Sequence, residues 1–354
     1  MKLVALHTSD RLAFKRCRRK WDLGSSLRRG LTPVDTTERL ALWLGSGLHF
    51  ALEDYHGYRR FPSPVEALEA YYQAFRPEEL PDDADNDKGM PLLINMLEYY
   101  PQWLAAPGRY QYETLIINGV PQVEVPFELE LTDLSTPTLT VVYRGTLDRV
   151  VVDSEGGYWV QDYKTTRIID LNRMINDPQM KAYTWAAEQM YNVPFEGALL
   201  TQLVKAYPHP PAQLTRGGYS VDKRQKTTHA LVRSTLIEHF GSIPNQYVDY
   251  LNHLALLEQP EGNSFIRTDR IMHNTATKVQ TYQHILAEAS EMLNLSLPIY
   301  PNETRDCPWD CSDFRAVCLA MEDGGDWLTL INENYKLKGE DRQEWRKRIK
   351  WPHQ

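Results

Sequence analysis

Two aspartates near the middle of the chain lie in strand-like runs with the spacing of facing residues. The runs 139–152 and 158–165 are rich in β-branched and aromatic residues, and residues 153–157 between them (DSEGG) have the composition of a turn. This pattern predicts a β-hairpin. If the loop is symmetric, Asp148 stands directly opposite Asp162, with their Cβ atoms about 5 Å apart.

Lys164 adds a positive charge to this pair, because residues two apart on a strand share one face. Two neighbouring carboxylates repel unless a divalent cation lies between them, and an ammonium beside them could orient water or offset charge on a phosphate. The alternative is a surface hairpin with a cross-strand charge cluster, and a β-bulge would change the register. The apolar strands around Asp162 place the charges at the edge of a core, where unpaired acids are costly.

Two helical segments carry further candidates. His49 lies one turn after Gly45, and neutral imidazole is a common metal ligand, while glycine permits another backbone to approach closely. Gln179 and Tyr183 are four residues apart on one helix face, just after the hairpin. Each of these residues could also be an ordinary core or surface residue.

The elements that must position these groups follow from periodicity and turn signals. Ser63-Pro64-Val65-Glu66 has the pattern of a capping box, and the acidic, Pro-bearing stretch 76–89 reads as an exposed loop. Helices are expected at 37–56, from Ser63 onward, and at 90–105, 177–191, 223–257 and 272–294, and strands at 121–132, 139–152, 158–165 and 197–207. The order predicts an α/β fold, with a strand-rich centre in a jacket of helices and a polar, charged tail after Cys318.

Composition places this 354-residue chain among ordinary globular proteins, with 42% hydrophobic and 24% charged residues. No stretch resembles a membrane span or a signal peptide, so we expect a soluble cytoplasmic protein. The net charge of −8 argues against a polycation that coats nucleic acid, although basic runs at 15–20 and 346–350 leave room for a local basic groove.

Four motifs in this order resemble the RecB-type branch of the PD-(D/E)XK nucleases. They are GxxxH (Gly45, His49), GxxD (Gly145, Asp148), DxK (Asp162, Lys164) and QxxxY (Gln179, Tyr183). The segments SDRLAFKRC and CPWDCSDFRAVC are similar to the iron–sulfur subset of that branch, exemplified by the AddB nuclease domain and the CRISPR-associated RecB-like exonucleases. The resemblance spans residues 9–318.

The resemblance implies a restriction-endonuclease-like core with a central mixed sheet and a Mg²⁺ or Mn²⁺ site. It implies that His49, Asp148, Asp162 and the carbonyl of Tyr163 ligate the cation, that Lys164 is the catalytic lysine, and that Gln179 and Tyr183 organise the site and the DNA strand. The chain departs from the pattern at Arg18, where the family often has proline, and at Asp162, where glutamate is commoner.

Four cysteines, Cys17, Cys307, Cys311 and Cys318, are expected to bind metal rather than to form disulfides. Their spacing differs from that of a typical Cys₄ zinc site and suits a [4Fe–4S] cluster, which would join the two ends of the chain around the core. Structural zinc and unligated thiols remain the alternatives. The arginines beside Cys17 make the rim of the cluster a candidate DNA contact.

These observations divide the chain into an N-terminal strap, a helical region with the histidine, a nuclease core, a second helical region with the cysteines, and a charged tail. The predicted bounds are 1–30, 31–118, 119–240, 241–318 and 319–354.

The function that follows is a Mg/Mn-dependent deoxyribonuclease, expected to act as an exonuclease in DNA repair, recombination or phage DNA processing. Its substrate would be DNA that is single-stranded or has free ends. The sequence has no GxxxxGK[ST] phosphate loop, so unwinding would need a helicase or recombination partner. A DNA-binding subunit that does not cut is one alternative, and a scaffold with structural zinc and a merely charged hairpin is another.

Overall fold

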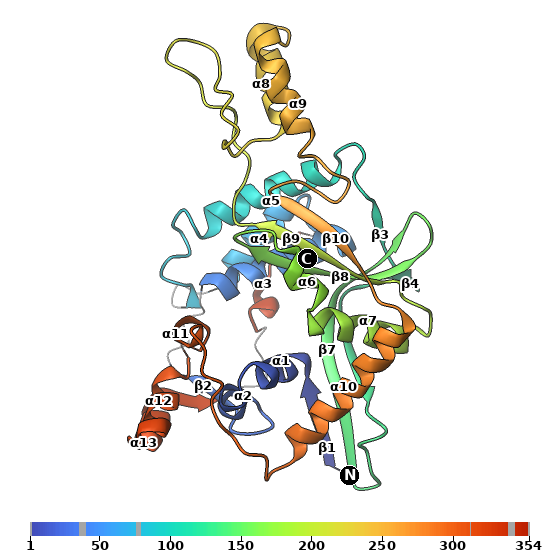
Figure 1. Cartoon of the computed structure of the whole chain (residues 1–354), viewed down its shortest axis with the longest axis vertical. Helices are drawn as coiled ribbons and strands as arrows, with labels where there is room; N and C mark the ends of the chain where they lie inside the picture. The colour runs from blue at the N-terminus through green and yellow to red at the C-terminus, as the bar shows by residue number, and fades with distance from the viewer. Residues whose placement is uncertain (1, 35–39, 76–78, 312, 339–343, 353–354) are drawn as a thin grey trace.

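The computed structural model describes residues 2–34, 40–75, 79–311, 313–338 and 344–352 (Figure 1). The strands are β1 Lys2–His7, β2 Leu31–Pro33, β3 Tyr112–Thr114, β4 Ile116–Ile117, β5 Val120–Pro121, β6 Val123–Glu130, β7 Leu139–Asp153, β8 Tyr158–Thr166, β9 Gly197–Val204, β10 Ile266–Met272 and β11 Tyr335–Leu337. The α-helices are α1 Thr8–Arg16, α2 Arg18–Gly24, α3 Leu40–Glu53, α4 Pro64–Gln73, α5 Met90–Leu104, α6 Leu171–Ile175, α7 Pro178–Tyr191, α8 His229–Phe240, α9 Val248–Ala255, α10 Thr275–Leu293, α11 Cys307–Asp310, α12 Arg315–Asp323 and α13 Trp327–Asn334. A π-helical turn, Asp54–Tyr58, follows α3, and 3₁₀ turns lie at Asn245–Tyr247 and Glu344–Arg348.

A seven-stranded mixed sheet forms the centre, in the order β1-β7-β8-β9-β10, with β3 and β6 also paired to β7. The β1–β7 and β8–β9 pairs are parallel, whereas β7 is antiparallel to β3, β6 and β8. The predicted α/β fold with a central mixed sheet is therefore confirmed.

The long strand β7 changes partner halfway along one of its edges. Residues 139–144 pair with β1, and residues 149–152 pair with β8. Since β6 and β3 occupy the other edge along these stretches, β1 and β8 must share one edge of β7. The sheet therefore forks between Arg144 and Arg149, and residues 145–148 are left without a ladder partner on that side.

Two hydrophobic layers cover the sheet. One contains buried side chains of α1, α7 and α10, including Met180 and Ile285, packed on sheet residues such as Val160. The other is built from α3, α4 and α5 and reaches the sheet at Tyr163 and Leu203. Groups from both layers can meet where the sheet is open, at the fork.

The predicted hairpin and helix starts agree with the structure. In the β7–β8 hairpin Arg149 pairs with Gln161 and Val150 with Val160, the register expected for a symmetric loop. The Ser63 hydroxyl accepts a hydrogen bond from the Glu66 N–H and so caps α4, an arrangement that stabilises a helix by about 1 kcal/mol.

Several elements differ from the sequence expectation. Strands β1 and β10 were not predicted, and the expected helix 223–257 is instead two helices, α8 and α9. Residues 37–39 and 76–78 of the predicted helix and loop lie outside the described residues. The stretch after Cys318 contains α13, β11 and a 3₁₀ turn, and its Trp345 is buried against the α3–α5 layer because an indole gains free energy on leaving water.

The two ends of the chain pack on each other. Strand β2 pairs with β11, and Leu23 and Leu31 share a small core with Phe314 and Val317. Figure 1 shows the N-terminal helices beside the C-terminal ones. These contacts do not test the predicted domain bounds.

Within the described residues, no helix is both long enough and apolar enough to cross a membrane.

Candidate metal and catalytic site

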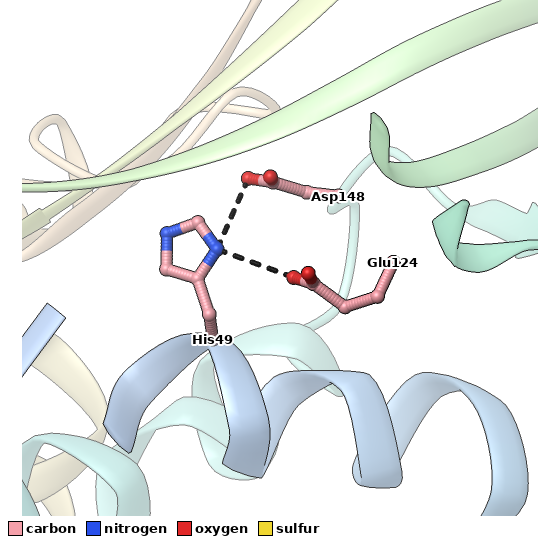
Figure 2. Close-up of side chains that lie close together, drawn as sticks. All are labelled: His49, Glu124 and Asp148. Carbon is pink, nitrogen blue, oxygen red and sulfur yellow. Dashed lines mark ion pairs between the residues drawn. The ribbon is translucent and has the colours of Figure 1, made fainter. Parts of the chain in front are cut away.

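Three side chains from three elements converge at the fork (Figure 2). His49 comes from α3, Glu124 from β6 and Asp148 from β7. His49 Nδ1 lies 3.4 Å from Glu124 Oε1 and 3.4 Å from Asp148 Oδ2. One ligand atom from each residue lies within 4.8 Å of the others, a spacing that a single metal ion can bridge.

Glu124 is the member of this group that the sequence did not single out. The β6–β7 register pairs Val123 with Arg149 and Val125 with Leu147, so Glu124 stands opposite Asp148. Its φ is +47°, which is strained for a residue other than glycine and is typical of functional sites. In the sequence Glu124 is one of several glutamates that alternate with apolar residues. Only the register between β6 and β7 shows that it lies opposite Asp148.

Asp148 uses the gap in the sheet. The ladder between β7 and β8 ends at Arg149 and Gln161, and beyond it the Tyr163 N–H donates to Asp148 Oδ2 at 2.9 Å. A side-chain carboxylate thus replaces the backbone acceptor that a continuous ladder would supply. The Tyr163 carbonyl points to the same region and lies 3.2 Å from His49 Nε2.

The register behind the site is held by Arg149, a buried arginine on the opposite face. Its guanidinium donates to Thr114 Oγ1, to Gln161 Oε1 and to the carbonyl of Tyr112. Three strands are joined through one side chain directly beside Asp148. We infer that this network fixes the position of the carboxylate.

Asp162 is fully buried and forms a second group with Lys164. Lys164 Nζ donates to Asp162 Oδ1 at 3.1 Å. The other oxygen, Oδ2, is 2.8 Å from the same nitrogen but has no well-aligned hydrogen bond. Burial raises the pKa of Asp162 to about 7, a rise that Lys164 opposes. A buried carboxylate oxygen that lacks a donor is costly, and a cation would satisfy it.

Gln179 and Tyr183 approach this second group from α7. Gln179 Nε2 lies 3.5 Å from Asp162 Oδ1, at the limit of a hydrogen bond. Tyr183 is buried in the layer beneath, where burial and the charges of Asp162 and Asp148 raise its pKa far above the usual value. The residues predicted for the metal and catalytic site therefore lie at or next to the fork, although Asp162 does not belong to the group of His49, Glu124 and Asp148.

The charges at the fork are strongly coupled. Burial lowers the pKa of His49, but the Asp148 and Glu124 carboxylates outweigh it and raise this pKa well above its ordinary value. Burial opposes ionisation of Asp148, yet His49 and Lys164 lower its pKa, whereas burial raises that of Glu124. Carboxylate, imidazole and carbonyl groups are common ligands of divalent cations, so the residues fit a divalent metal ion.

The glycines of the two motifs serve different purposes. A Cβ at Gly145 would lie 2.5 Å from the Phe127 ring and 2.8 Å from Thr8 Oγ1, so this position has no room for a side chain. The expected close approach at Gly45 is wrong, because a Cβ there would meet nothing within 4 Å. The crowded glycine of α3 is Gly47, against Tyr71.

The four cysteines occur together at the packed chain ends. Their side chains line one cavity of about 310 Å³, and Lys20 and Arg19 also line it. All four are free and partly exposed, and burial raises the pKa of Cys311 to about 11. Among the described residues, no three of the sulfur atoms come within 4.8 Å of one another, so the thiols do not form a preformed single-ion site.

Comparison with known proteins agrees with this geometry. The family model of the PD-(D/E)XK nuclease superfamily matches residues 9–318, which include the fork, α7 and all four cysteines. No curated protein sequence matches the chain. A family match over most of the chain, joined to acids, a lysine and a histidine at a fork in a mixed sheet, places this protein in the PD-(D/E)XK nuclease superfamily.

Proposed function

We propose that the protein is a Mg²⁺- or Mn²⁺-dependent deoxyribonuclease that acts as an exonuclease. The observation that carries the proposal is the convergence of His49, Glu124 and Asp148 beside a buried Asp162 oxygen without a hydrogen-bond donor. Three carboxylates, those of Glu124, Asp148 and Asp162, gather at the fork, where a divalent cation would offset their charge, and Lys164 supplies a fixed positive charge beside them.

A divalent cation, when bound, lowers the pKa of water and offsets charge on a phosphate. We assign its binding to His49, Asp148, Asp162 and the Tyr163 carbonyl, with Glu124 as an additional ligand. The chain's own groups then have separate tasks. Lys164 stabilises negative charge that develops on the phosphate, Gln179 holds Asp162, and Tyr183 supports Gln179 from the layer beneath.

The cysteines are proposed to hold a [4Fe–4S] cluster. A zinc ion with thiolate bonds of about 2.3 Å needs its sulfur ligands closer together than these are, whereas a cubane takes more widely spaced ones. The 310 Å³ cavity and its position between the chain ends support this reading. The cluster would then be structural, joining the two ends.

Three parts of the proposal go beyond membership of the family. They are exonuclease action, a DNA substrate that is single-stranded or has free ends, and a helicase or recombination partner. A DNA-binding subunit that does not cut is the second candidate. The intact set of Asp148, Asp162 and Lys164 favours the cutting enzyme over it.

The test compares degradation of linear and closed circular DNA by the parent and by Lys164→Ala, with Mn²⁺ or Mg²⁺. We expect the parent to degrade linear DNA only, and Lys164→Ala to lower the initial rate about 10³-fold, because it removes a charge aimed at the phosphate. The matched control is Lys88→Ala, an exposed lysine in the 79–89 loop, which should keep the parental rate.

Each result has a separate meaning. Cleavage of circular DNA at the linear rate would replace exonuclease with endonuclease action. Equal rates for Lys164→Ala and Lys88→Ala would overturn the catalytic assignment. A parent that binds DNA without cutting it under any divalent cation would favour the second candidate.

A further inference from the structure

The segment between β9 and β10 leaves the sheet beside the proposed active site. Residues 205–257, here called the arm, contain a loop (205–228) and helices α8 and α9, and Figure 1 shows them projecting from one end of the molecule. The helices have a small core of their own, which includes Val232, Leu236 and Tyr250. The arm is therefore a separate feature held out from the main body.

The base of the arm lies next to the strand that carries Lys164. Strands β8 and β9 run parallel and end together at Thr166 and Val204, and the Lys205 N–H donates to the Thr166 carbonyl at 2.8 Å. Arg167 and Lys205 follow these strand ends. At about 3.3 Å per residue, Arg167 is about 10 Å along the chain from Lys164.

The arm loop has an unusual charge for this acidic protein. It contains five lysines and arginines and one aspartate, in a chain whose net charge is −8. The aspartate, Asp222, pairs with Arg224. In the part of the chain that the structure describes, Lys205, Arg216, Lys223 and Lys226 form no ion pair. Lys205 also lies close to Arg167, and burial together with that positive neighbour lowers its pKa.

Aromatic rings alternate with these cations. Tyr207 and His209 lie two and four residues beyond Lys205, and their ring centroids are 4.4 Å apart. His209 is exposed and Tyr207 half-exposed. The His209 N–H donates to the Lys226 carbonyl at 2.7 Å, so the returning half of the loop brings Lys226 alongside the rings. Cations that follow a backbone, with rings on which bases stack, are the features of single-strand binding surfaces.

We propose that the arm loop binds a single strand of the nucleic acid substrate as it enters or leaves the active site. Arg167 and Lys205 contact the first phosphates beyond the site, Tyr207 and His209 stack on bases, and Lys226 and Lys223 continue along the backbone. This inference rests on the proposed nuclease function for its link to the active site, but binding by the arm is measurable without cleavage.

The test is equilibrium binding of a fluorescein-labelled oligothymidylate in EDTA, over a series of salt concentrations, where no cleavage interferes. We expect Tyr207→Ala to weaken binding about 10-fold through loss of stacking. Lys205→Ala combined with Lys226→Ala should weaken it further and reduce the salt slope by about 0.7 for each lysine removed. In cleavage assays the same variants should raise KM and leave kcat within about twofold, because they lie outside the chemistry.

The matched control is Lys2→Ala, an exposed lysine of β1 that pairs with Leu139 at the start of β7, and this variant should bind as the parent does. Lys205→Arg, which keeps the charge, should retain the salt slope, and thermal melting checks that each variant is folded.

Two outcomes would overturn the inference. One is a parent that does not bind oligothymidylate. The other is arm variants with the parental affinity and salt slope, a result that would favour a protein as the binding partner of the arm. A parent that binds through the arm but cuts no DNA would refute the nuclease proposal alone.

Discussion

The sheet fork and the cysteine cavity are two candidate cofactor sites that the fold supports very differently. At the fork the candidate ligands are held by α3, β6 and β7 and by hydrogen bonds such as that from the Tyr163 N–H to Asp148. At the chain ends the cysteines are partly exposed and line a cavity of about 310 Å³. At the fork three candidate ligand atoms already lie within reach of one ion, whereas among the described residues no three of the cysteine sulfur atoms do.

This difference has an energetic side. The fork carries a cost in the free energy of folding, because Asp162 is fully buried and burial opposes the ionisation of its carboxyl group. The chain ends are held together by a small core around Phe314, the β2–β11 ladder and polar contacts such as the Arg19–Glu322 ion pair. Cofactor loss should therefore affect chemistry at the fork and stability at the chain ends.

The largest expected effect on stability comes from the proposed cluster. Cys311→Ser should remove iron and destabilise the protein by about 3 kcal/mol, by analogy with a cross-link that closes a long loop. Iron and zinc counted on anaerobically purified protein, with calorimetric unfolding, provide the measurement, and EDTA treatment that strips only Mg²⁺ is the comparison. About one zinc and no iron in the parent would contradict the cluster. A Cys311→Ser variant as stable as the parent would contradict the idea that a cofactor at the chain ends stabilises the fold.

A smaller effect concerns the pH dependence of metal binding at the fork. The Asp148 and Glu124 carboxylates raise the pKa of His49 and so favour its protonated form, and a proton held there must leave when a cation binds. Mn²⁺ affinity should therefore rise with pH, by about tenfold per pH unit for each proton released. The rise should be steeper below pH 7, because Asp162, whose pKa is about 7, is also protonated there.

Isothermal titration with Mn²⁺ at several pH values measures this dependence. His49→Gln should bind more weakly and with a shallower slope. An affinity independent of pH would show that the cation binds elsewhere.

The smallest expected effect is a gain in stability from a substitution that removes activity. Because folding raises the pKa of Asp162, its contribution to stability is fully present below its unfolded pKa and is lost as pH rises through about 7. Asp162→Asn should thus stabilise the metal-free protein by about 1 kcal/mol above pH 7, and the gain should vanish in acid.

Asp153 at the turn of the same hairpin is the matched control. It accepts hydrogen bonds from the N–H groups of Glu155 and Gly157, and its pKa is lowered, so Asp153→Asn should destabilise. Denaturant unfolding across this pH range distinguishes the two. A loss of stability for Asp162→Asn at pH 8 would refute the idea that this carboxylate is costly.

The sequence by itself determined the hairpin and named the residues that are predicted to form the site. Turn composition and strand periodicity are local properties, so the turn at residues 153–157 and the register of the β7–β8 hairpin follow from short stretches. The helix start at Ser63 is equally local, since a hydroxyl caps an N–H three residues away. The family motifs placed His49 and α7 at the same site without showing how they reach it.

The tertiary structure alone decided the partners that are distant in the chain. Glu124 joins the site because β6 pairs with β7 in a register that no local pattern specifies. The fork exists because β1, from the N-terminus, occupies part of the edge that β8 would otherwise share. Trp345, near the other end of the chain, is likewise buried in the α3–α5 layer through contacts with residues that are distant in the sequence. Such contacts depend on which surfaces can be buried together, a property of the whole fold and not of any short segment.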